Sequence, residues 1–236
     1  MRKKEFIISC LIAFVAALLF LAISLIVFLN NGETAFDNNI ANSMYNFRGE
    51  KGGFIYFLFR MITEFGYIYV SIVIGIIGLV YTGIDRGLIL FAFGYVLQAV
   101  INIAFKTMFN RERPLETMRW QVDNESSFPS GHSATVAFMF PYITYYLFKT
   151  KRQNWLKYTA LGITVAIIPL VMWSRLVLGM HYFTDVVAGF SIGIFSFSIT
   201  TLFYLWFEKY DLFTKGLINF FGKKKNEKKN EENIEA

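Results

Sequence analysis

The chain has 236 residues, of which 55% are hydrophobic and only 17% are charged. This charged fraction is well below the roughly 25% of soluble domains, and the apolar residues come in long unbroken runs, which excludes an ordinary soluble globular protein. The formal net charge is +6, and basic residues beside apolar runs indicate membrane topology rather than nucleic-acid binding.

Six apolar runs are long enough, or nearly so, to cross a bilayer as helices, because a hydrocarbon core of about 30 Å needs about 20 residues. In chain order the predicted spans are residues 6–29, 65–84, 87–105, 131–148, 158–174 and 182–207. The first run is too long for a signal peptide and has no small-residue cleavage site after it. Residues 52–59 are too short to cross and predict an interfacial or re-entrant helix. The predicted fold class is an all-α, polytopic membrane protein with six transmembrane helices.

Lysine and arginine gather before the first run, between the fourth and fifth runs, and in the C-terminal tail. Such residues concentrate in cytoplasmic segments, and six spans put these three segments on one side. Both termini are therefore expected in the cytoplasm. Residues 1–211 would form one domain in the plasma membrane, and residues 212–236 a basic, partly disordered cytoplasmic tail. That tail suits anionic lipid head groups, and no nucleic acid or obligate protein partner is predicted.

Three polar clusters interrupt the apolar runs, each beside the end of a predicted span. They are, in chain order, Lys106 with Arg113-Pro114; Pro129-Ser130-Gly131-His132; and Ser174-Arg175 with His181 and Asp185. On the predicted topology all of them lie on the outer side. Because that topology is drawn from loop charge without using the clusters, their convergence supports it independently. The clusters therefore predict one site that faces outward.

The residue types of these clusters suit phosphate, whose monoesters carry close to two negative charges. Lys106, Arg113 and Arg175 supply three cations, and a guanidinium binds two phosphate oxygens at once. Ser130 and Gly131 lead into the fourth span, where free backbone N–H groups and the helix dipole attract an anion. We predict that these five residues bind the substrate phosphate.

The chain has two histidines, His132 and His181. Asp185 follows His181 by four residues, so both lie on one helix face if the sixth helix begins by residue 181. A carboxylate bonded to one ring nitrogen makes the other nitrogen a better nucleophile. We therefore predict that Asp185 orients His181, that His181 attacks phosphorus to form a phosphohistidine, and that His132 is the general acid and then the general base.

Each cluster alone has an ordinary structural explanation, since Pro-Ser-Gly is a common helix start and membrane-edge arginines anchor to head groups. Only their combination on one side favours catalysis. Three nearby cations would repel a divalent ion, so we predict no metal and no cofactor.

Together the clusters resemble the complete three-part signature of the type 2 phosphatidic acid phosphatase superfamily, with no departure in any specified residue. The resemblance implies a helical, metal-independent phosphatase, with His181 as nucleophile, His132 as acid and Asp185 as the partner of His181. It implies the same phosphate ligands as above: Lys106, Arg113, Ser130, Gly131 and Arg175. The six runs point to the membrane lipid phosphatase branch, which includes the bacterial phosphatidylglycerophosphatase B and undecaprenyl pyrophosphate phosphatase families.

The expected function is hydrolysis of phosphate from a membrane lipid at the outer face. Candidate substrates are phosphatidylglycerophosphate, undecaprenyl pyrophosphate and phosphatidic acid, among which the sequence does not choose. Two alternatives stay open: a phosphotransferase that uses another lipid or a sugar as acceptor, and a non-catalytic lipid-binding or transport protein. Product analysis separates the first from hydrolysis, and a lack of phosphate release would favour the second.

Overall fold

The computed structural model describes residues 3–32, 34–50, 52–82, 85–115, 118–120 and 125–210, and every regular element in these ranges is a helix. The all-α prediction is confirmed for this part of the chain, and the predicted tail at residues 212–236 lies outside it. The elements are α1 (Lys3–Leu29), α2 (Ala35–Arg48), α3 (Phe54–Thr63), the 3-10 helix η1 (Glu64–Gly66), α4 (Ile68–Thr82), α5 (Arg86–Phe109), α6 (Gly131–Lys149), α7 (Asn154–Val177) and α8 (Phe183–Tyr210).

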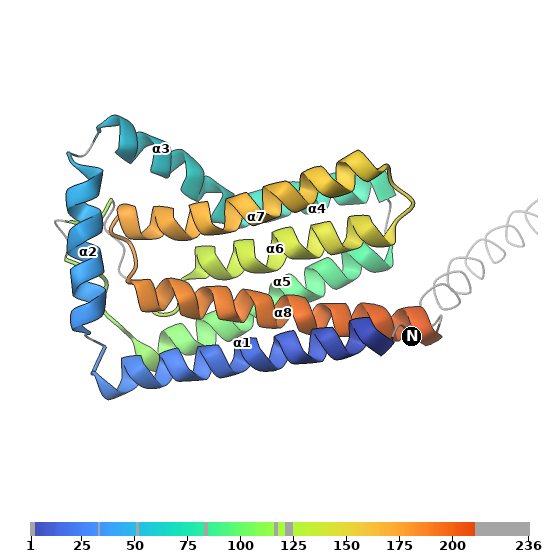
Figure 1. Cartoon of the computed structure of the whole chain (residues 1–236), viewed down its shortest axis with the longest axis horizontal. Coiled ribbons are helices and arrows are strands. Elements are labelled where there is room, and N and C mark those ends of the chain that lie inside the picture. Colours follow the sequence, from blue (N-terminus) through green and yellow to red (C-terminus); the bar gives the residue numbers. More distant parts are fainter. Residues whose placement is uncertain are drawn as a thin grey trace, which may run out of the picture.

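The helices α1 and α4 to α8 lie side by side in a bundle, and α2 lies across one end of it (Figure 1). The start of α1 and the end of α8 lie together at the opposite end. An ion pair holds this second end together, because Lys149 at the end of α6 donates to Glu5 in the first turn of α1 at 2.5 Å. The two ends of the bundle are therefore distinct, and both described chain ends belong to the same one.

Four helices, α1, α5, α7 and α8, are long and apolar enough to cross a membrane. The pair formed by α3–η1 and α4 is a fifth candidate, bent by 51° at its break. Within the described residues α6 does not qualify, so the predicted number of six transmembrane helices is not confirmed. The reason is its polar residues, such as Ser133 and Thr144, which the contacts of α6 with α5, α7 and α8 cover. A helix enclosed by other helices needs no lipid-compatible surface.

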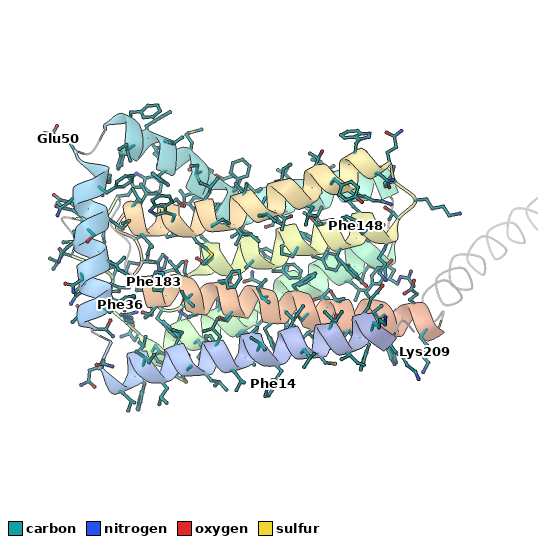
Figure 2. The ribbon with its side chains drawn as sticks, in the orientation of Figure 1. Phe14, Phe36, Glu50, Phe148, Phe183 and Lys209 are labelled. Carbon is teal, nitrogen blue, oxygen red and sulfur yellow. The ribbon has the colours of Figure 1, made fainter. Side chains whose placement is uncertain are left out.

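The second predicted span, residues 65–84, differs most from the structure. Its helix α4 begins only at Ile68, and the preceding η1 turns the chain into α3. The short aromatic segment at 52–59 begins this α3 helix, on which Phe54 is 80% exposed. Phe14 on α1 is also 62% exposed and points away from the bundle (Figure 2). Exposed apolar side chains on this scale suit a lipid environment rather than water.

Glycines allow α6 and α8 to pack at close range. A Cβ atom at Gly189 would lie 2.2 Å from the Ser130 carbonyl oxygen, and one at Gly193 would lie 2.4 Å from that of Ala134. Only glycine permits so close an approach of one helix to the backbone of another. This contact fixes the start of α6 against the start of α8, where two of the sequence clusters lie.

Candidate active site

Four helix ends meet where α2 crosses the bundle. There α5 ends at Phe109, α6 begins at Gly131, α7 ends at Val177 and α8 begins at Phe183. A cavity of about 340 Å³ lies among them, lined in part by Tyr67, Asn102, Ile103 and Glu125. The rest of its lining comes from the three sequence clusters: Lys106, Arg113, Gly131, His132, Arg175 and His181.

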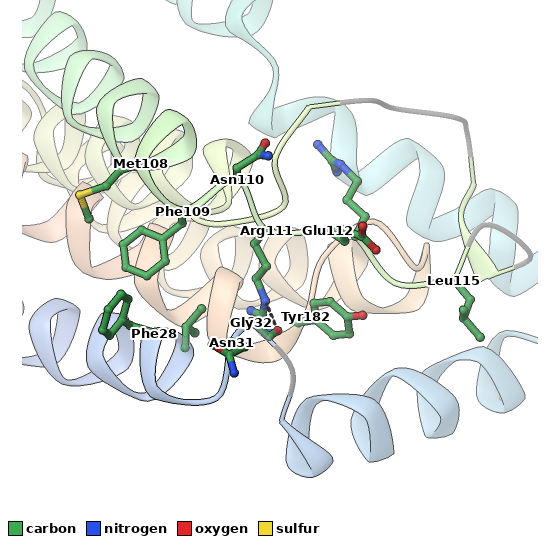
Figure 3. A pocket seen from close by; sticks show the side chains of 12 residues that line it. Phe28, Asn31, Gly32, Met108, Phe109, Asn110, Arg111, Glu112, Leu115 and Tyr182 are labelled. Atoms are coloured by element: carbon green, nitrogen blue, oxygen red, sulfur yellow. Dashed lines mark hydrogen bonds between the residues drawn. The ribbon is translucent and has the colours of Figure 1, made fainter.

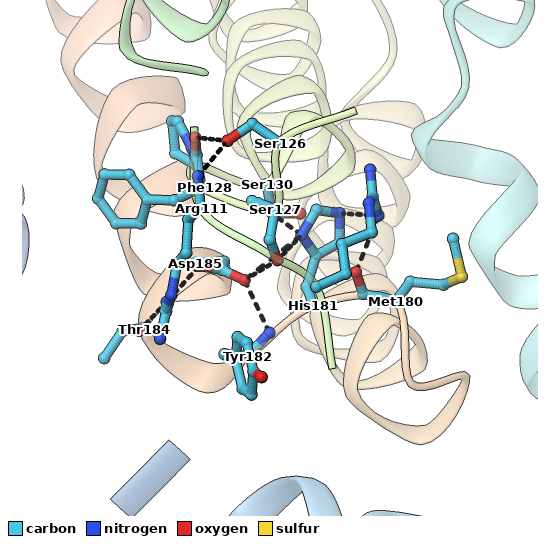
Figure 4. Close-up of polar contacts among 12 residues, drawn as sticks. Arg111, Ser126, Ser127, Phe128, Ser130, Met180, His181, Tyr182, Thr184 and Asp185 are labelled. Carbon is cyan, nitrogen blue, oxygen red and sulfur yellow. Dashed lines mark hydrogen bonds and ion pairs between the residues drawn. The ribbon is translucent and has the colours of Figure 1, made fainter. Parts of the chain in front are cut away.

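His181 lies in the turn between α7 and α8 and is 3% exposed. Its Nδ1 lies 2.8 Å from the carbonyl oxygen of Ser127 (Figure 4). Because a carbonyl only accepts, Nδ1 carries the ring proton and Nε2 keeps its lone pair. Nε2 lies 3.4 Å from Nη1 of Arg113, at the cavity wall. This tautomer is the one that a nucleophilic Nε2 requires.

Asp185 acts on His181 less directly than the sequence suggests. Its Oδ2 lies 3.6 Å from Nδ1 of His181, longer than a hydrogen bond, because the Ser127 carbonyl takes the Nδ1 proton. This Oδ2 accepts instead from the Ser127 hydroxyl and from the backbone N–H of Tyr182, the latter at 2.8 Å. Asp185 therefore orients Ser127, and Ser127 orients the imidazole ring.

Three cations reach the cavity from separate segments, and protein oxygens hold each of them in place. Lys106 lies in the last turn of α5 and Arg175 in the last turn of α7, while Arg113 lies in the loop after α5. Their partners are the Ser126 carbonyl at 2.7 Å for Lys106, Thr63 Oγ1 at 2.8 Å for Arg175, and the Met180 and Glu125 carbonyls at 2.8 and 3.0 Å for Arg113. Lys106 also pairs with the Glu125 carboxylate at 3.2 Å, so the three cations and this carboxylate together carry two positive charges, which balance a phosphate dianion.

His132 lies in the first turn of α6 and lines the same cavity. Its ring meets Tyr67 edge to face, with the ring centroids 4.4 Å apart. Its Nε2 is buried and has no hydrogen-bond partner within the part of the chain that the structure describes. Because such a nitrogen is costly without a partner, it suits a bound group that brings an oxygen.

The start of α6 presents backbone to the cavity. Gly131 lines it, whereas Ser130 is fully buried behind. The Ser130 hydroxyl caps α6 by accepting from the Ser133 N–H at 3.5 Å, and the Ser130 N–H donates to the Asp185 carbonyl at 3.0 Å. Gly131 is thus placed to contact an anion, and Ser130 positions the helix start whose N–H groups attract it.

Burial lowers the pKa of His181 well below its ordinary value of 6.5, and the positive charges of Arg113, Arg175 and Lys106 lower the pKa further. The hydrogen bond to the Ser127 carbonyl opposes this shift. His181 is therefore neutral at pH 7, which is the state that can attack phosphorus.

Several residues of the site were not found from the sequence. Asn102 donates to the Pro129 carbonyl at 3.4 Å and so holds the loop before α6. Its signal was available, since it is a polar residue one helical turn before Lys106 in an apolar run. Arg111 and Asp37, which are buried beside Asp185, and Ser127 had no such signal.

The family model of the PAP2 superfamily matches residues 87–209, just over half of the 236-residue chain. The chain belongs to the PAP2 superfamily. The resemblance seen in the three sequence clusters is thereby confirmed, and the clusters of this PAP2 protein all fall within the matched residues.

Two curated relatives are similar to part of this PAP2 chain. Phosphatidylglycerophosphatase B of Bacillus subtilis (strain 168) is 32% identical over 117 residues, which cover 48% of this chain and 55% of the relative. The chloroplastic lipid phosphate phosphatase epsilon 2 of Arabidopsis thaliana is 26% identical over 100 residues, which cover 42% of this chain and 34% of the relative. The chain thus spans about half and one third of the lengths of these relatives.

Two crystal structures share the fold. A transmembrane PAP2-type phosphatidylglycerolphosphate phosphatase from Bacillus subtilis has a TM-score of 0.70 at 26% identity, over 81% of this chain and 94% of that chain. Aquifex aeolicus LpxE has a TM-score of 0.59 at 21% identity, over 72% of this chain and 96% of that chain, which is a likeness of fold alone. This PAP2 protein therefore has a membrane-protein fold.

Proposed function

We propose that the protein is a lipid phosphate phosphatase that works through a phosphohistidine on His181. The observation that carries this proposal is the unprotonated Nε2 of His181, which lies at the wall of a cavity that three cations also reach. The names of the two curated relatives support a lipid phosphate as substrate. Candidate substrates are phosphatidylglycerophosphate, undecaprenyl pyrophosphate and phosphatidic acid.

In the first step Nε2 of His181 attacks phosphorus, the N–P bond forms, and the bond from phosphorus to the leaving oxygen breaks. His132 donates its proton to that oxygen, so the lipid leaves as an alcohol, or as a monophosphate if the substrate is a pyrophosphate. Lys106, Arg113 and Arg175 stabilise the charge on the three remaining phosphate oxygens. The Ser127 carbonyl accepts a hydrogen bond from Nδ1–H and so stabilises the positive charge that the ring gains.

In the second step His132, now neutral, takes a proton from water as the water oxygen attacks phosphorus. The N–P bond breaks, inorganic phosphate leaves, and His181 and His132 return to their starting states. The chain's own residues supply every proton transfer in this cycle, so we expect turnover without a divalent metal or another cofactor.

The position of the cavity suits a substrate with a lipid tail. Tyr67 and Ile103 line it, and Ile103 on α5 is 61% exposed, so the cavity reaches the apolar surface of the bundle beside the start of α4. A head group could enter from the membrane there while its tail stays in lipid. We place this end of the bundle at the outer membrane face, because the N-terminal Lys3 and Lys4 and the basic loop after α6 lie at the other end.

The proposal is tested by phosphate release from the three candidate lipids in a chelating buffer, with purified wild-type protein and the His181→Ala variant. We expect wild-type turnover on a long-chain lipid, slower turnover on a short soluble ester, inhibition by vanadate, and no turnover by His181→Ala. Rapid acid-free quenching with labelled substrate should trap label on wild-type protein. Unchanged turnover in His181→Ala would remove the mechanism, and equal rates on soluble and lipid esters would remove the lipid class.

A further inference from the structure

Arg111 occupies one of the six unspecified positions between Lys106 and Arg113, yet it is among the most completely paired side chains near the site. Its side chain is 2% exposed. Its Nη1 donates to Asp185 Oδ1 at 2.5 Å, and its Nη2 donates to Asp37 Oδ2 at 2.8 Å. The guanidinium therefore bridges two buried carboxylates. Although burial alone would lower the pKa of Arg111, the charges of Asp185 and Asp37 raise it above its usual value.

Arg111 does not reach the cavity that holds His181. It lines a second, larger cavity of about 700 Å³ between the end of α1 and the loop after α5, where its Nε donates to the Gly32 carbonyl at 2.7 Å (Figure 3). Tyr182 lies beneath it, with the guanidinium carbon 4.4 Å from the ring centroid. Arg111 is therefore not part of the lining of the first cavity, and the guanidinium can affect the reaction only through the residues that it holds, among which Asp185 lies next to Ser127.

Asp37, the second carboxylate, comes from the first turn of α2 and is 1% exposed. Its Oδ1 accepts from the Thr184 N–H at 3.0 Å, and its Oδ2 accepts from the Thr184 hydroxyl at 2.6 Å. Thr184 is the residue before Asp185 in the first turn of α8. These bonds attach the outer helix α2 to the helix start that carries Asp185.

The contacts continue from Asp185 to the reacting ring. With Oδ1 held by Arg111, Oδ2 is directed to the Ser127 hydroxyl. The Ser127 carbonyl in turn accepts from His181 Nδ1 (Figure 4), and the Ser127 N–H donates to the Arg111 carbonyl at 2.8 Å. The connected series runs Asp37, Arg111, Asp185, Ser127, His181.

We infer that Asp37 and Arg111 are positioning residues for phosphoryl transfer, so that helix α2 is part of the active site. This inference rests on the proposed role of His181 as nucleophile. Asp37 holds Arg111, Arg111 fixes the orientation of the Asp185 carboxylate, and Asp185 fixes Ser127 and the ring. Because misplacement of a reacting group by about 1 Å costs on the order of a hundredfold in rate, loss of Asp37 should lower kcat. Helix α2, which lies outside the family match at 87–209, would thus be required for full catalysis.

The test compares kcat and KM of Asp37→Asn with wild type on a long-chain lipid phosphate, in protein that elutes as a folded species and well below its unfolding temperature. We expect kcat to fall on the order of tenfold to a hundredfold, the phosphohistidine to form more slowly in rapid quench, and KM to change less than threefold, since Asp37 does not line the substrate cavity. A purely structural role would lower the thermal midpoint and leave kcat of the folded protein unchanged.

Thr184 provides a second, milder pair of variants in case Asp37→Asn does not fold. Thr184→Val removes the hydroxyl that bonds both Asp37 and Arg111, and we expect a loss of kcat, whereas Thr184→Ser keeps the hydroxyl and should restore it. Glu5→Gln is the matched control, because it breaks an ion pair at the far end of the bundle and should keep wild-type kcat.

Wild-type kcat in either Asp37→Asn or Thr184→Val would overturn the inference. If His181→Ala is inactive while both of these variants keep full kcat, only the positioning role fails. If His181→Ala retains turnover, the proposed mechanism fails first and the positioning role with it.

Discussion

His181 combines a nearly complete burial with three neighbouring cations. Both conditions disfavour the imidazolium form, because a buried positive charge loses hydration and is repelled by like charges. The lowered pKa keeps the ring neutral, and the Ser127 carbonyl fixes the proton on Nδ1. In the proposed mechanism, the cations that would bind the phosphate therefore also keep His181 unprotonated.

This arrangement determines the pH dependence of kcat/KM. A protonated His181 is inactive, and its folded-state pKa lies below 6.5, so we expect the acid limb of the profile below pH 6.5. At high pH kcat/KM should fall again, because His132 loses the proton that it donates to the leaving oxygen, so the profile should be bell-shaped. Lys106→Met removes one of the charges that lower the pKa of His181, so its acid limb should move toward 6.5.

The measurement is kcat/KM over about pH 4.5 to 9, with the same lipid for both proteins so that substrate ionisation is common to them. An acid limb at or above 6.5 in the wild-type protein, or one that Lys106→Met leaves in place, would contradict this account.

Ser127 links Asp185 to His181 with both its hydroxyl and its carbonyl. Ser127→Ala keeps the carbonyl and removes the hydroxyl, so Asp185 loses one partner but the ring keeps its own. Because a hydrogen bond to a charged group contributes about 1.5–3 kcal/mol, we expect kcat to fall on the order of tenfold, measured by phosphate release. Ser191→Ala on α8, whose hydroxyl bonds only within its own helix, should keep full kcat; equal rates in the two variants would argue against the link.

The residue types and spacing of the three clusters were enough to predict most of the cavity lining, because Lys106, His132 and Arg175 lie at helix ends that the apolar runs already mark. The intermediate position of Ser127 was not predictable. It depends on the path of the loop before α6, and spacing along a helix only brings Asp185 to the same face as His181. The pairing of Arg111 with Asp37 joins distant segments, which one sequence does not reveal.

At the scale of elements, the close contact of α6 with α8 fixes the relative positions of His132 and Asp185 at the two helix starts. Gly193→Ala would place a Cβ atom 2.4 Å from the Ala134 carbonyl oxygen and 2.6 Å from the Ala137 Cβ. Because overpacking of this kind costs about 1–3 kcal/mol, we expect a lower thermal midpoint in detergent, followed by intrinsic fluorescence.

Gly162→Ala in α7 is the matched control, since no heavy atom lies within 4 Å of a Cβ at that position. Alanine is the better helix former, by roughly 1 kcal/mol, so Gly162→Ala should match or exceed the wild-type midpoint. A Gly193→Ala protein as stable as Gly162→Ala would show that the two helices separate without cost.

Helix positions were predictable from the apolar runs, and each predicted run overlaps one helix of the bundle. The bend between α3 and α4 was not predictable. The residues from Phe65 to Thr82 form one apolar run, and the turn at η1 contains no proline that would indicate a break. The enclosed position of α6 was not predictable either, since its many polar residues, such as Ser133 and Thr144, become acceptable only when neighbouring helices cover them.

At the scale of the whole molecule, an even number of membrane crossings returns the chain to the side on which it started, and an odd number leaves it on the opposite side. The start of α1 and the end of α8 lie at the same end of the bundle, so a chain that crosses with α1, α4, α5, α6, α7 and α8 brings these two helix ends to one side of the membrane. Five crossings would separate them. We therefore expect α6 to cross the membrane although its own hydropathy does not qualify it.

Labelling with a membrane-impermeant maleimide tests this topology. In a Cys10→Ser background, which removes the chain's one cysteine, we expect Asn39→Cys on the exposed side of α2 to react in intact cells. Asn154→Cys, exposed at the start of α7, should react only after permeabilisation. The reverse pattern would place the cavity on the cytoplasmic side, and reaction of both sites in intact cells would contradict the number of crossings.

The bonds between Asp37 and Thr184 join positions 147 residues apart, which has a consequence for biogenesis. A nascent chain exposes Asp37 early and Arg111 after α5, but Thr184 leaves the ribosome only with the final helix. The end of the bundle that α2 crosses is therefore completed last, after α8 has been inserted. Translation products that stop before His181 lack both the proposed nucleophile and the segment to which α2 attaches, so we expect these incomplete chains to be inactive in the membrane.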